Sequence, residues 1–339
     1  MLDHLAHLPS KAMALAQLLT ISDEEFHSFM GTYNTLFTNS PENTKEDYEK
    51  GVPMQGYALG SSRELEQYYK IIHLLCTLGS VEKMYMPPCL DPSKSVLQNQ
   101  ILLERQMAKD IAVGPGSLAL DLGCGCGAIA AHVAELTGCT VYGINLDRSQ
   151  IEKAWRVQKN REQLHFSVGD FNKPLPFGDN MFDAVYNVQA LTYASDLEAT
   201  CREAFRVLKP GGRFFSNDVA CLDAYDRNNE EHRTLIQHTR ELTAFGGFWY
   251  YKYWEDALKK AGFELLVSEG VSAVGVIEKE IALYDKYEAT VATLAKIRVM
   301  PRKLEAMLRR MNANANSYVE AEKRDLIRLN WRLVAKKPA

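Results

Sequence analysis

The chain has no long apolar run and no large excess of charge of either sign. No segment contains the roughly 18 or more consecutive apolar residues that a membrane-spanning helix requires. Its first residues, Met1 to His7, lack a basic stretch followed by an apolar one, so we expect no secretory signal. The formal net charge of −4 argues against nucleic acid as a partner. These absences favour a cytoplasmic globular protein.

Cysteine spacings typical of metal sites are also missing. The seven cysteines are odd in number and scattered, and no two of them have the C-x-x-C spacing of zinc ligands. Two of them, Cys124 and Cys126, lie within a glycine-rich segment. We therefore expect reduced thiols and no metal site.

That glycine-rich segment, residues 118–127 with the sequence LALDLGCGCG, is the most informative part of the chain. It reads as a short buried strand that breaks into three alternating glycines and then enters a helix over 128–137. Glycines allow the backbone to turn sharply and to approach a ligand closely. The amides at the start of a helix carry partial positive charge, and the Asp121 carboxylate can accept hydrogen bonds. We therefore expect a bound cofactor with polar and planar parts.

Two cofactors fit this loop. The spacing Gly123-x-Gly125-x-x-Ala128 matches the dinucleotide fingerprint with alanine in the third place. The spacing Asp121-x-Gly123-x-Gly125-x-Gly127 instead looks like the S-adenosylmethionine loop of class I methyltransferases. The loop by itself does not distinguish between the two cofactors. The choice depends on the residues that follow the loop.

From residue 117 to residue 270 the pattern alternates between strands and helices, which is typical of a doubly wound parallel sheet of the Rossmann-like α/β class. A turn is expected at Lys209–Gly212 and a loop over 39–56. The expected strands are 118–122, 140–144, 164–168, 182–188, 213–218 and 264–269, and the expected helices are 128–137, 149–161, 196–207 and 252–261.

Helical segments flank this core on both sides. Residues 1–105 are mostly helical in pattern and predict a lid or substrate segment. Residues 106–270 predict the cofactor-binding core. Residues 271–339 predict a helical extension that ends in a strand near 329–335.

Three features follow the glycine loop in order. The second expected strand ends in Asn145, with Asp147 two residues later, where dinucleotide enzymes place an acid for the ribose. The third ends in Gly169-Asp170-Phe171. The Asp170 carboxylate can accept from the amino group of adenine, and the Phe171 ring can pack on the face of the base. The fourth runs into Asn187-Val188-Gln189, and the helix after it ends in the sequence RVLKPGG over 206–212. Together with the loop, these features resemble class I S-adenosylmethionine-dependent methyltransferases.

This resemblance implies methyl transfer as the activity and S-adenosylmethionine as the cofactor. Because the sulfonium methyl group is already activated, the protein need supply no metal and no nucleophile. It has to exclude water, hold the acceptor in line and remove a proton where one is released. The residues that the resemblance places at the cofactor are Asp121, Gly123, Cys124, Gly125, Gly127, Asn145, Leu146, Gln150, Gly169, Asp170, Phe171 and Asn187.

A closer resemblance is to the sterol 24-C-methyltransferases. It is strong through 118–270 and looser elsewhere between Tyr68 and the C-terminus. The pair Tyr68-Tyr69 stands where that family has a paired tyrosine. The other matching stretches are GCTVYGIN at 138–145, DAYDRNNEEHR at 223–233, KAGFE at 260–264 and LVAKKP at 333–338.

Two acidic positions of that family are changed here. After the paired tyrosine the family has an acidic, aromatic segment built around Y-E-Y-G-W-G, whereas residues 73–80 read HLLCTLGS and carry no carboxylate. After the fourth strand the family has E-A-T-C-H, whereas residues 189–193 read QALTY. Gln189 therefore replaces the acid and Tyr193 replaces the histidine. The acid at the end of the fifth strand is present as Asp218.

These changes bear on the acceptor, which we expect to be a sterol or related isoprenoid lipid that is methylated at carbon. Methylation of a side-chain double bond creates a carbocation, which acidic and aromatic groups stabilise. Since two acids are replaced, methylation of a ring carbon beside a keto group, through an enolate, is an alternative. The candidate acid–base groups are His73, Tyr68, Tyr193 and Asp218, and the candidate substrate contacts are Tyr69, Gln189 and Trp249.

Other functions and partners stay open from the sequence. The same scaffold is compatible with methylation of O, N or S in a small polar acceptor, and the replaced acids are compatible with a donor-binding protein without catalysis. A homodimer is also compatible with the sequence. Peripheral contact with an anionic membrane would suit the basic residues of the C-terminal segment, which are Arg298, Arg302, Lys303, Arg309, Arg310 and Arg324.

Overall fold

The strands expected from the sequence form one sheet at the centre of the molecule. The computed structural model describes residues 8–35, 40–57, 62–78, 83–158 and 162–339. The strands of this part of the chain are β1 (Leu118–Leu122), β2 (Thr140–Asn145), β3 (Leu164–Val168), β4 (Phe182–Val188), β5 (Leu208–Cys221), β6 (Trp249–Tyr250), β7 (Glu264–Val271) and β8 (Ile327–Lys336).

The sheet has the order β3-β2-β1-β4-β5-β8-β7, and β6 pairs with β5 at the side of this path. Strand β8 runs antiparallel to β5 and to β7, whereas the other pairs are parallel. The Rossmann-like α/β class is therefore confirmed, with one antiparallel strand in a sheet that we expected to be parallel throughout. The strand order reverses between β1 and β4, and ligands of open α/β sheets bind at such a point.

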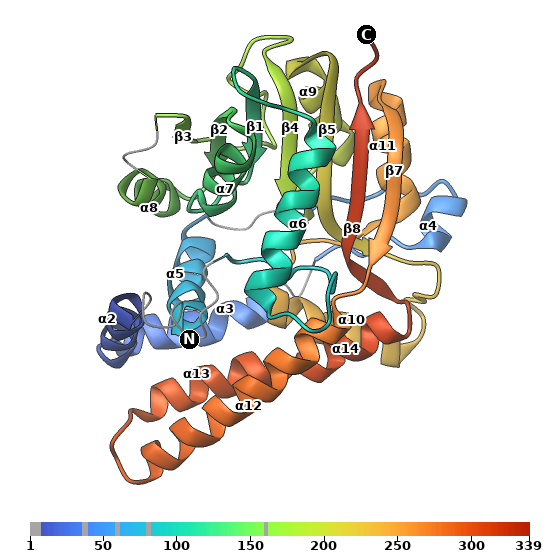
Figure 1. Cartoon of the computed structure of the whole chain (residues 1–339). Helices are drawn as coiled ribbons and strands as arrows, with labels where there is room; N and C mark the ends of the chain where they lie inside the picture. The colour runs from blue at the N-terminus through green and yellow to red at the C-terminus, as the bar shows by residue number, and fades with distance from the viewer. Residues whose placement is uncertain (1–7, 36–39, 58–61, 79–82, 159–161) are drawn as a thin grey trace.

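Helices cover both faces of the sheet (Figure 1). On one face α6 (Val96–Ile111), α7 (Ala128–Thr137) and α8 (Arg148–Gln158) bury apolar residues against it. On the other face α9 (Leu197–Val207) and α11 (Tyr251–Ala261) do the same. These two apolar layers hold the ends of the parallel strands in fixed positions.

A second group of helices lies beyond the edge at which the parallel strands end (Figure 1). Helices from both ends of the chain pack together there, since α2, α3, α5 and α13 share one apolar cluster that includes Phe29, Tyr68 and Leu304. The helices of this group are α2 (Leu8–Leu19), α3 (Asp23–Thr35), α5 (Ser62–Leu78), α10 (Glu230–Thr243), α12 (Val274–Lys296), α13 (Arg302–Asn312) and α14 (Ala315–Lys323).

Local structure differs from expectation in two places. Strand β5 begins at Leu208, so the expected turn Lys209–Gly212 belongs to the strand; there the amide of Gly211 donates to the carbonyl of Lys337 at 2.9 Å. In the described part of the expected loop over 39–56, a short helix α4 (Lys45–Glu49) forms. It forms because Thr44 and Asp47 cap each other's backbone amides.

Candidate active site

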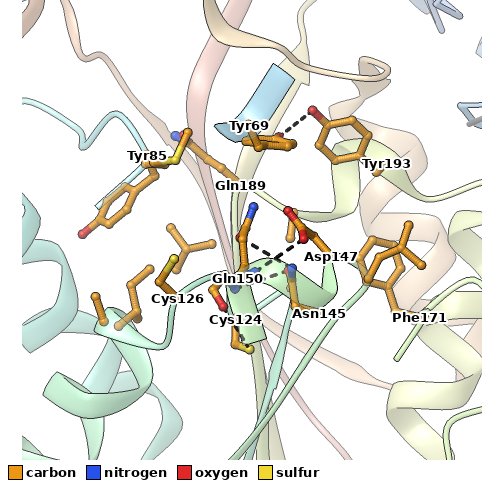
Figure 2. Close-up of a pocket in the computed structure, with 18 of the residues that line it drawn as sticks. Tyr69, Tyr85, Cys124, Cys126, Asn145, Asp147, Gln150, Phe171, Gln189 and Tyr193 are labelled. Atoms are coloured by element: carbon orange, nitrogen blue, oxygen red, sulfur yellow. Dashed lines mark hydrogen bonds between the residues drawn. The ribbon is translucent and has the colours of Figure 1, made fainter. Parts of the chain in front are cut away.

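A cavity lined by both polar and apolar residues lies at the carboxyl ends of β1 to β4, and we call it the loop cavity (Figure 2). Helix α5 covers it with Tyr69 and His73. Of the residues predicted to contact a cofactor, those that line the loop cavity are Gly123, Cys124, Gly125, Asn145, Leu146, Gln150, Gly169, Asp170 and Phe171.

The glycine loop needs its glycines for close approach. Gly123 has a φ of +81°, and a Cβ there would lie 2.5 Å from the Cβ of Ala190. Gly127 does not line the cavity; a Cβ at this position would lie 2.4 Å from the Phe166 ring. Gly127 is therefore required for packing of the loop, whereas Gly123 and Gly125 form the cavity wall.

The N-terminus of α7 is open to the loop cavity. Its N-cap residue is Gly127, which has no side chain to accept from the first-turn amides. Ala128 and Ile129, the first residues of the helix, line the cavity. Free amides with partial positive charge at this position suit a ligand carboxylate.

Asp147 lines the cavity and has one carboxylate oxygen without a partner among the described residues. Its Oδ1 accepts from the amide and the hydroxyl of Ser149, both at 2.7 Å. Its Oδ2 is buried and has no partner among the described residues. By contrast, Oδ1 of Asn145 already accepts from the amide of Gly125 at 3.3 Å. Asp147 was visible in the sequence two residues beyond the strand, but the resemblance pointed to Asn145 alone.

Besides Gly127, four predicted site residues lie outside the cavities. Asp121 is buried below the loop, and burial raises the pKa of its carboxyl to about 8. Asn187 is fully buried and donates to Asp218 at 3.0 Å. Trp249 is buried between the sheet and α11, and its indole N–H donates to the carbonyl of Leu191 at 3.2 Å. We therefore assign Asn187 and Trp249 to the scaffold around the site.

Asp218 is the fourth of these residues, and backbone amides hold its carboxylate. Its Oδ2 accepts from the amide of Leu191 at 2.8 Å, and its Oδ1 accepts from the amide of Val219 at 2.9 Å. It is 2% exposed, and burial raises the pKa of the carboxyl to about 7. These contacts fix the turn after β4, which contains the short helix η1 (Leu191–Tyr193).

A second, more apolar cavity adjoins the loop cavity, and we call it the apolar chamber. Its walls come from α5, α10, α12 and α14 together with the segment 84–86. Apolar side chains such as Ile72, Phe245 and Ile277 cover much of its surface. The residues that line both cavities, and so form the junction between them, are Tyr69, Met84, Tyr85, Gln189 and Tyr193.

Two tyrosines at the junction form a directed hydrogen-bond chain (Figure 2). The hydroxyl of Tyr193 donates to the carbonyl of Ala244, which uses its only hydrogen. The hydroxyl of Tyr69 therefore donates to Tyr193, at 2.8 Å. Burial raises the pKa of Tyr69 to about 12 and raises that of Tyr193 well above its ordinary value, so both phenols are neutral near pH 7. The oxygen of Tyr69 keeps a lone pair that can accept.

Gln189 connects the junction to the segment 84–86 through two hydrogen bonds. Its Oε1 accepts from the amide of Met86 at 3.1 Å, and its Nε2 donates to the carbonyl of the same residue at 2.8 Å. Gln189 adopts a φ of +50°, an uncommon value for a residue with a side chain. The paired contact with Met86 compensates for this conformation and positions one wall of the junction.

His73 and Tyr68 occupy different surfaces of α5. His73 lines the loop cavity, where the Lys153 ammonium donates to its Nε2. Burial and this ammonium lower the pKa of His73 to about 4. With Nε2 accepting, the neutral ring carries its proton on Nδ1, which is buried and has no hydrogen-bond partner among the described residues. Tyr68 lines the apolar chamber and stacks on Phe29 at a centroid distance of 5.9 Å.

Comparison with known proteins identifies the domain type. The family described as “Methyltransferase domain” matches residues 120–216. Over 172 residues the chain is 38% identical to a sterol 24-C-methyltransferase of Saccharomyces cerevisiae. This match covers 50% of the chain and 45% of that protein. The chain thus spans about half the length of this relative.

Solved structures share the fold. The cyclase SpnF superposes with a TM-score of 0.65 and 23% identity, over 84% of this chain and 99% of that one. The cyclopropane synthase MmaA2 from Mycobacterium tuberculosis superposes with a TM-score of 0.64 and 14% identity, over 76% of this chain and 90% of that one. These comparisons confirm three predictions: the class I methyltransferase fold, the resemblance to sterol 24-C-methyltransferases, and an S-adenosylmethionine-dependent methyltransferase domain.

Proposed function

We propose that this protein, which carries a methyltransferase domain of the class I fold, transfers a methyl group from S-adenosylmethionine to a carbon of a sterol or related isoprenoid lipid. The observation that carries this proposal is the apolar chamber beside the loop cavity, with a shared junction between them. A methyl group held at the junction would face an acceptor in the chamber. An apolar wall suits a hydrocarbon acceptor.

The loop cavity has the groups that S-adenosylmethionine requires. The open N-terminus of α7 suits its carboxylate, and the free oxygen of Asp147 suits its ribose hydroxyls. Leu146 and Phe171 offer apolar surface to the adenine, and Asp170 can accept from its amino group. When bound, the donor supplies an activated methyl group. Helix α5 then excludes water from above.

Aromatic rings stand at the junction where positive charge would develop. Tyr69, Tyr85 and Tyr193 line it, and Tyr68 lines the chamber beside it. The faces of such rings attract cations, more strongly where water is excluded. When one carbon of a double bond takes the methyl group, the other carbon becomes a cation until a proton is lost, so these rings support that route.

Methylation beside a ring ketone is the alternative position. That route needs a hydrogen-bond donor for the enolate oxygen. In the hydrogen-bond chain at the junction, Tyr193 donates to Ala244 and Tyr69 donates to Tyr193. Neither hydroxyl therefore has a hydrogen left to donate to a ligand. A ketone at the junction would require Tyr69 to reverse its hydrogen bond. The double-bond route requires no such change.

Purified protein with a donor labelled in its methyl group tests the proposal. Label in the sterol or isoprenoid fraction, with the methylated carbon assigned by mass spectrometry, supports it and separates side chain from ring. Label confined to water-soluble products would contradict it in favour of a small polar acceptor. Donor binding without turnover on any acceptor would favour the non-catalytic alternative, since the same fold also occurs in a cyclase.

We also propose that the turn between α12 and α13 contacts the lipid surface from which the acceptor comes. This hairpin extends away from the rest of the molecule (Figure 1). At its tip Ile297 and Val299 are 64% and 63% exposed. Lys296, Arg298 and Arg302 are exposed beside them and form no ion pair within the described part of the chain. Exposed apolar and basic residues together suit an anionic bilayer surface.

Within the described residues, no helix combines the length and the apolar composition that crossing a bilayer requires. We propose a peripheral contact, through the hairpin tip.

A further inference from the structure

One wall of the apolar chamber carries an isolated carboxylate. Glu280, on α12, is the one acidic residue among the described residues that line the chamber. None of α12, α13 and α14 contributes a residue to the loop cavity. Glu280 therefore faces the acceptor space but not the donor space.

The carboxylate of Glu280 stands alone among the described residues. It forms no hydrogen bond or ion pair with another described residue, and burial raises its pKa. Its neighbours on α12 behave differently, because Glu278 pairs with Lys323 and Lys279 donates to the carbonyl of Pro92. An unpaired carboxylate in an apolar cavity costs free energy unless a ligand compensates it.

A second polar group on the same wall is also unsatisfied. Tyr318, on α14, lines the chamber and is 1% exposed, and its hydroxyl has no partner among the described residues. Its ring belongs to the apolar cluster that includes Ile277 and Ile281, which flank Glu280 on α12. The two unsatisfied groups thus lie on adjoining helices of one wall, an acceptor on one and a donor–acceptor on the other.

We propose that Glu280 and Tyr318 form the recognition site for a hydroxyl group of the lipid acceptor. The hydroxyl donates to the Glu280 carboxylate, which supplies the partner that this carboxylate lacks, and the Tyr318 phenol gives the same wall a second polar group. The inference deepens the proposed function, because it names the polar feature of the acceptor.

The position of this wall also constrains the reaction. Methyl transfer takes place at the junction, whereas Glu280 and Tyr318 line only the chamber. The hydroxyl held there is therefore not the atom that receives the methyl group, and the product keeps it. The site orients the acceptor so that another part of its hydrocarbon body reaches the junction.

Binding of two matched probes tests the proposal without relying on turnover. The probes are a 3-hydroxysterol and the sterol hydrocarbon that lacks this hydroxyl, each measured with S-adenosylhomocysteine present. We expect the wild-type protein to bind the hydroxysterol roughly 10–100-fold more tightly. Glu280→Leu should remove most of this preference and leave the Kd for S-adenosylhomocysteine unchanged, and Tyr318→Phe should reduce the preference.

Glu278→Leu is the matched control, because it makes the same substitution at an exposed position of the same helix. It should keep the wild-type preference for the hydroxysterol. Equal binding of both probes by the wild type, or an unchanged preference in Glu280→Leu, would overturn the proposal even if sterol methylation is observed. Conversely, a hydroxyl preference that depends on Glu280 in a protein without methyl transfer would uphold this site and refute the proposed function.

Discussion

At the scale of single residues, Tyr69 separates the two routes of methyl transfer. Its ring lines both cavities, while its hydroxyl is committed as a donor to Tyr193. A route through a carbocation uses the ring face, whereas a route through an enolate uses the hydroxyl. Removing the two parts one at a time therefore distinguishes the routes.

We expect Tyr69→Phe to keep kcat within about threefold of wild type and Tyr69→Leu to lower it by roughly 10–100-fold. The measurement is single-turnover methyl transfer at saturating donor and acceptor. Tyr142→Phe, at a position in β2 that lines neither cavity, serves as the control for a lost phenol. A large loss in Tyr69→Phe would instead indicate the ketone route.

Substitution of Asp147 is expected to weaken binding of the donor. Asp147→Asn keeps the size of the side chain but removes the negative charge from the free oxygen. Since a hydrogen bond to a charged group is worth about 1.5–3 kcal/mol, we expect S-adenosylhomocysteine to bind roughly 10–100-fold more weakly. Isothermal calorimetry measures this, with the exposed Glu152→Gln as control. Unchanged affinity would remove Asp147 from the donor site.

At the scale of elements, the turn after β4 depends on Asp218. Its carboxylate accepts from the amide of Leu191 in the turn, from the amide of Val219 in β5 and from the side chain of Asn187. Asp218→Ala leaves these buried donors without partners, so we expect a loss of about 1–3 kcal/mol in the free energy of unfolding. Urea denaturation measures it, and Asp179→Ala at an exposed position is the control. An unchanged midpoint together with abolished activity would instead restore a catalytic role.

The α12–α13 hairpin is the element that we expect to bind lipid surfaces. The double variant Ile297→Asp, Val299→Asp replaces exposed apolar side chains with acids, which an anionic bilayer repels. We expect it to sediment at least about tenfold less with vesicles containing phosphatidylserine. Val157→Asp, at another exposed apolar position, should sediment as wild type does. Equal sedimentation of both variants would contradict the contact.

At the scale of the whole molecule, donor binding should stabilise the fold measurably. The loop cavity draws its walls from four strands, α5 and α7, so its ligand contacts both the sheet and the helical group. At about 100 times its Kd, S-adenosylhomocysteine should add about 2.7 kcal/mol to the free energy of unfolding. The expected readout is a Tm higher by several degrees. An equal shift with NAD would support the dinucleotide alternative.

The sequence by itself determined the secondary structure and the nature of the cofactor loop. Strands β1, β3 and β4 have the predicted bounds because their apolar runs end in glycine or polar residues. The loop was recognisable for the same reason, since alternating glycines are a local pattern. Such features depend on neighbours in the chain, and a sequence displays those neighbours directly.

Only the tertiary structure decided which polar side chains face a cavity. Asp218 and Trp249 lie in stretches that suited a site, yet packing buries both in the scaffold. We propose a role for Asp147 because Ser149 satisfies one of its oxygens and the other has no partner among the described residues. The apolar chamber arises where α5 meets α12 and α14, which are distant along the chain. Burial and pairing depend on contacts of this range, and no local pattern encodes them.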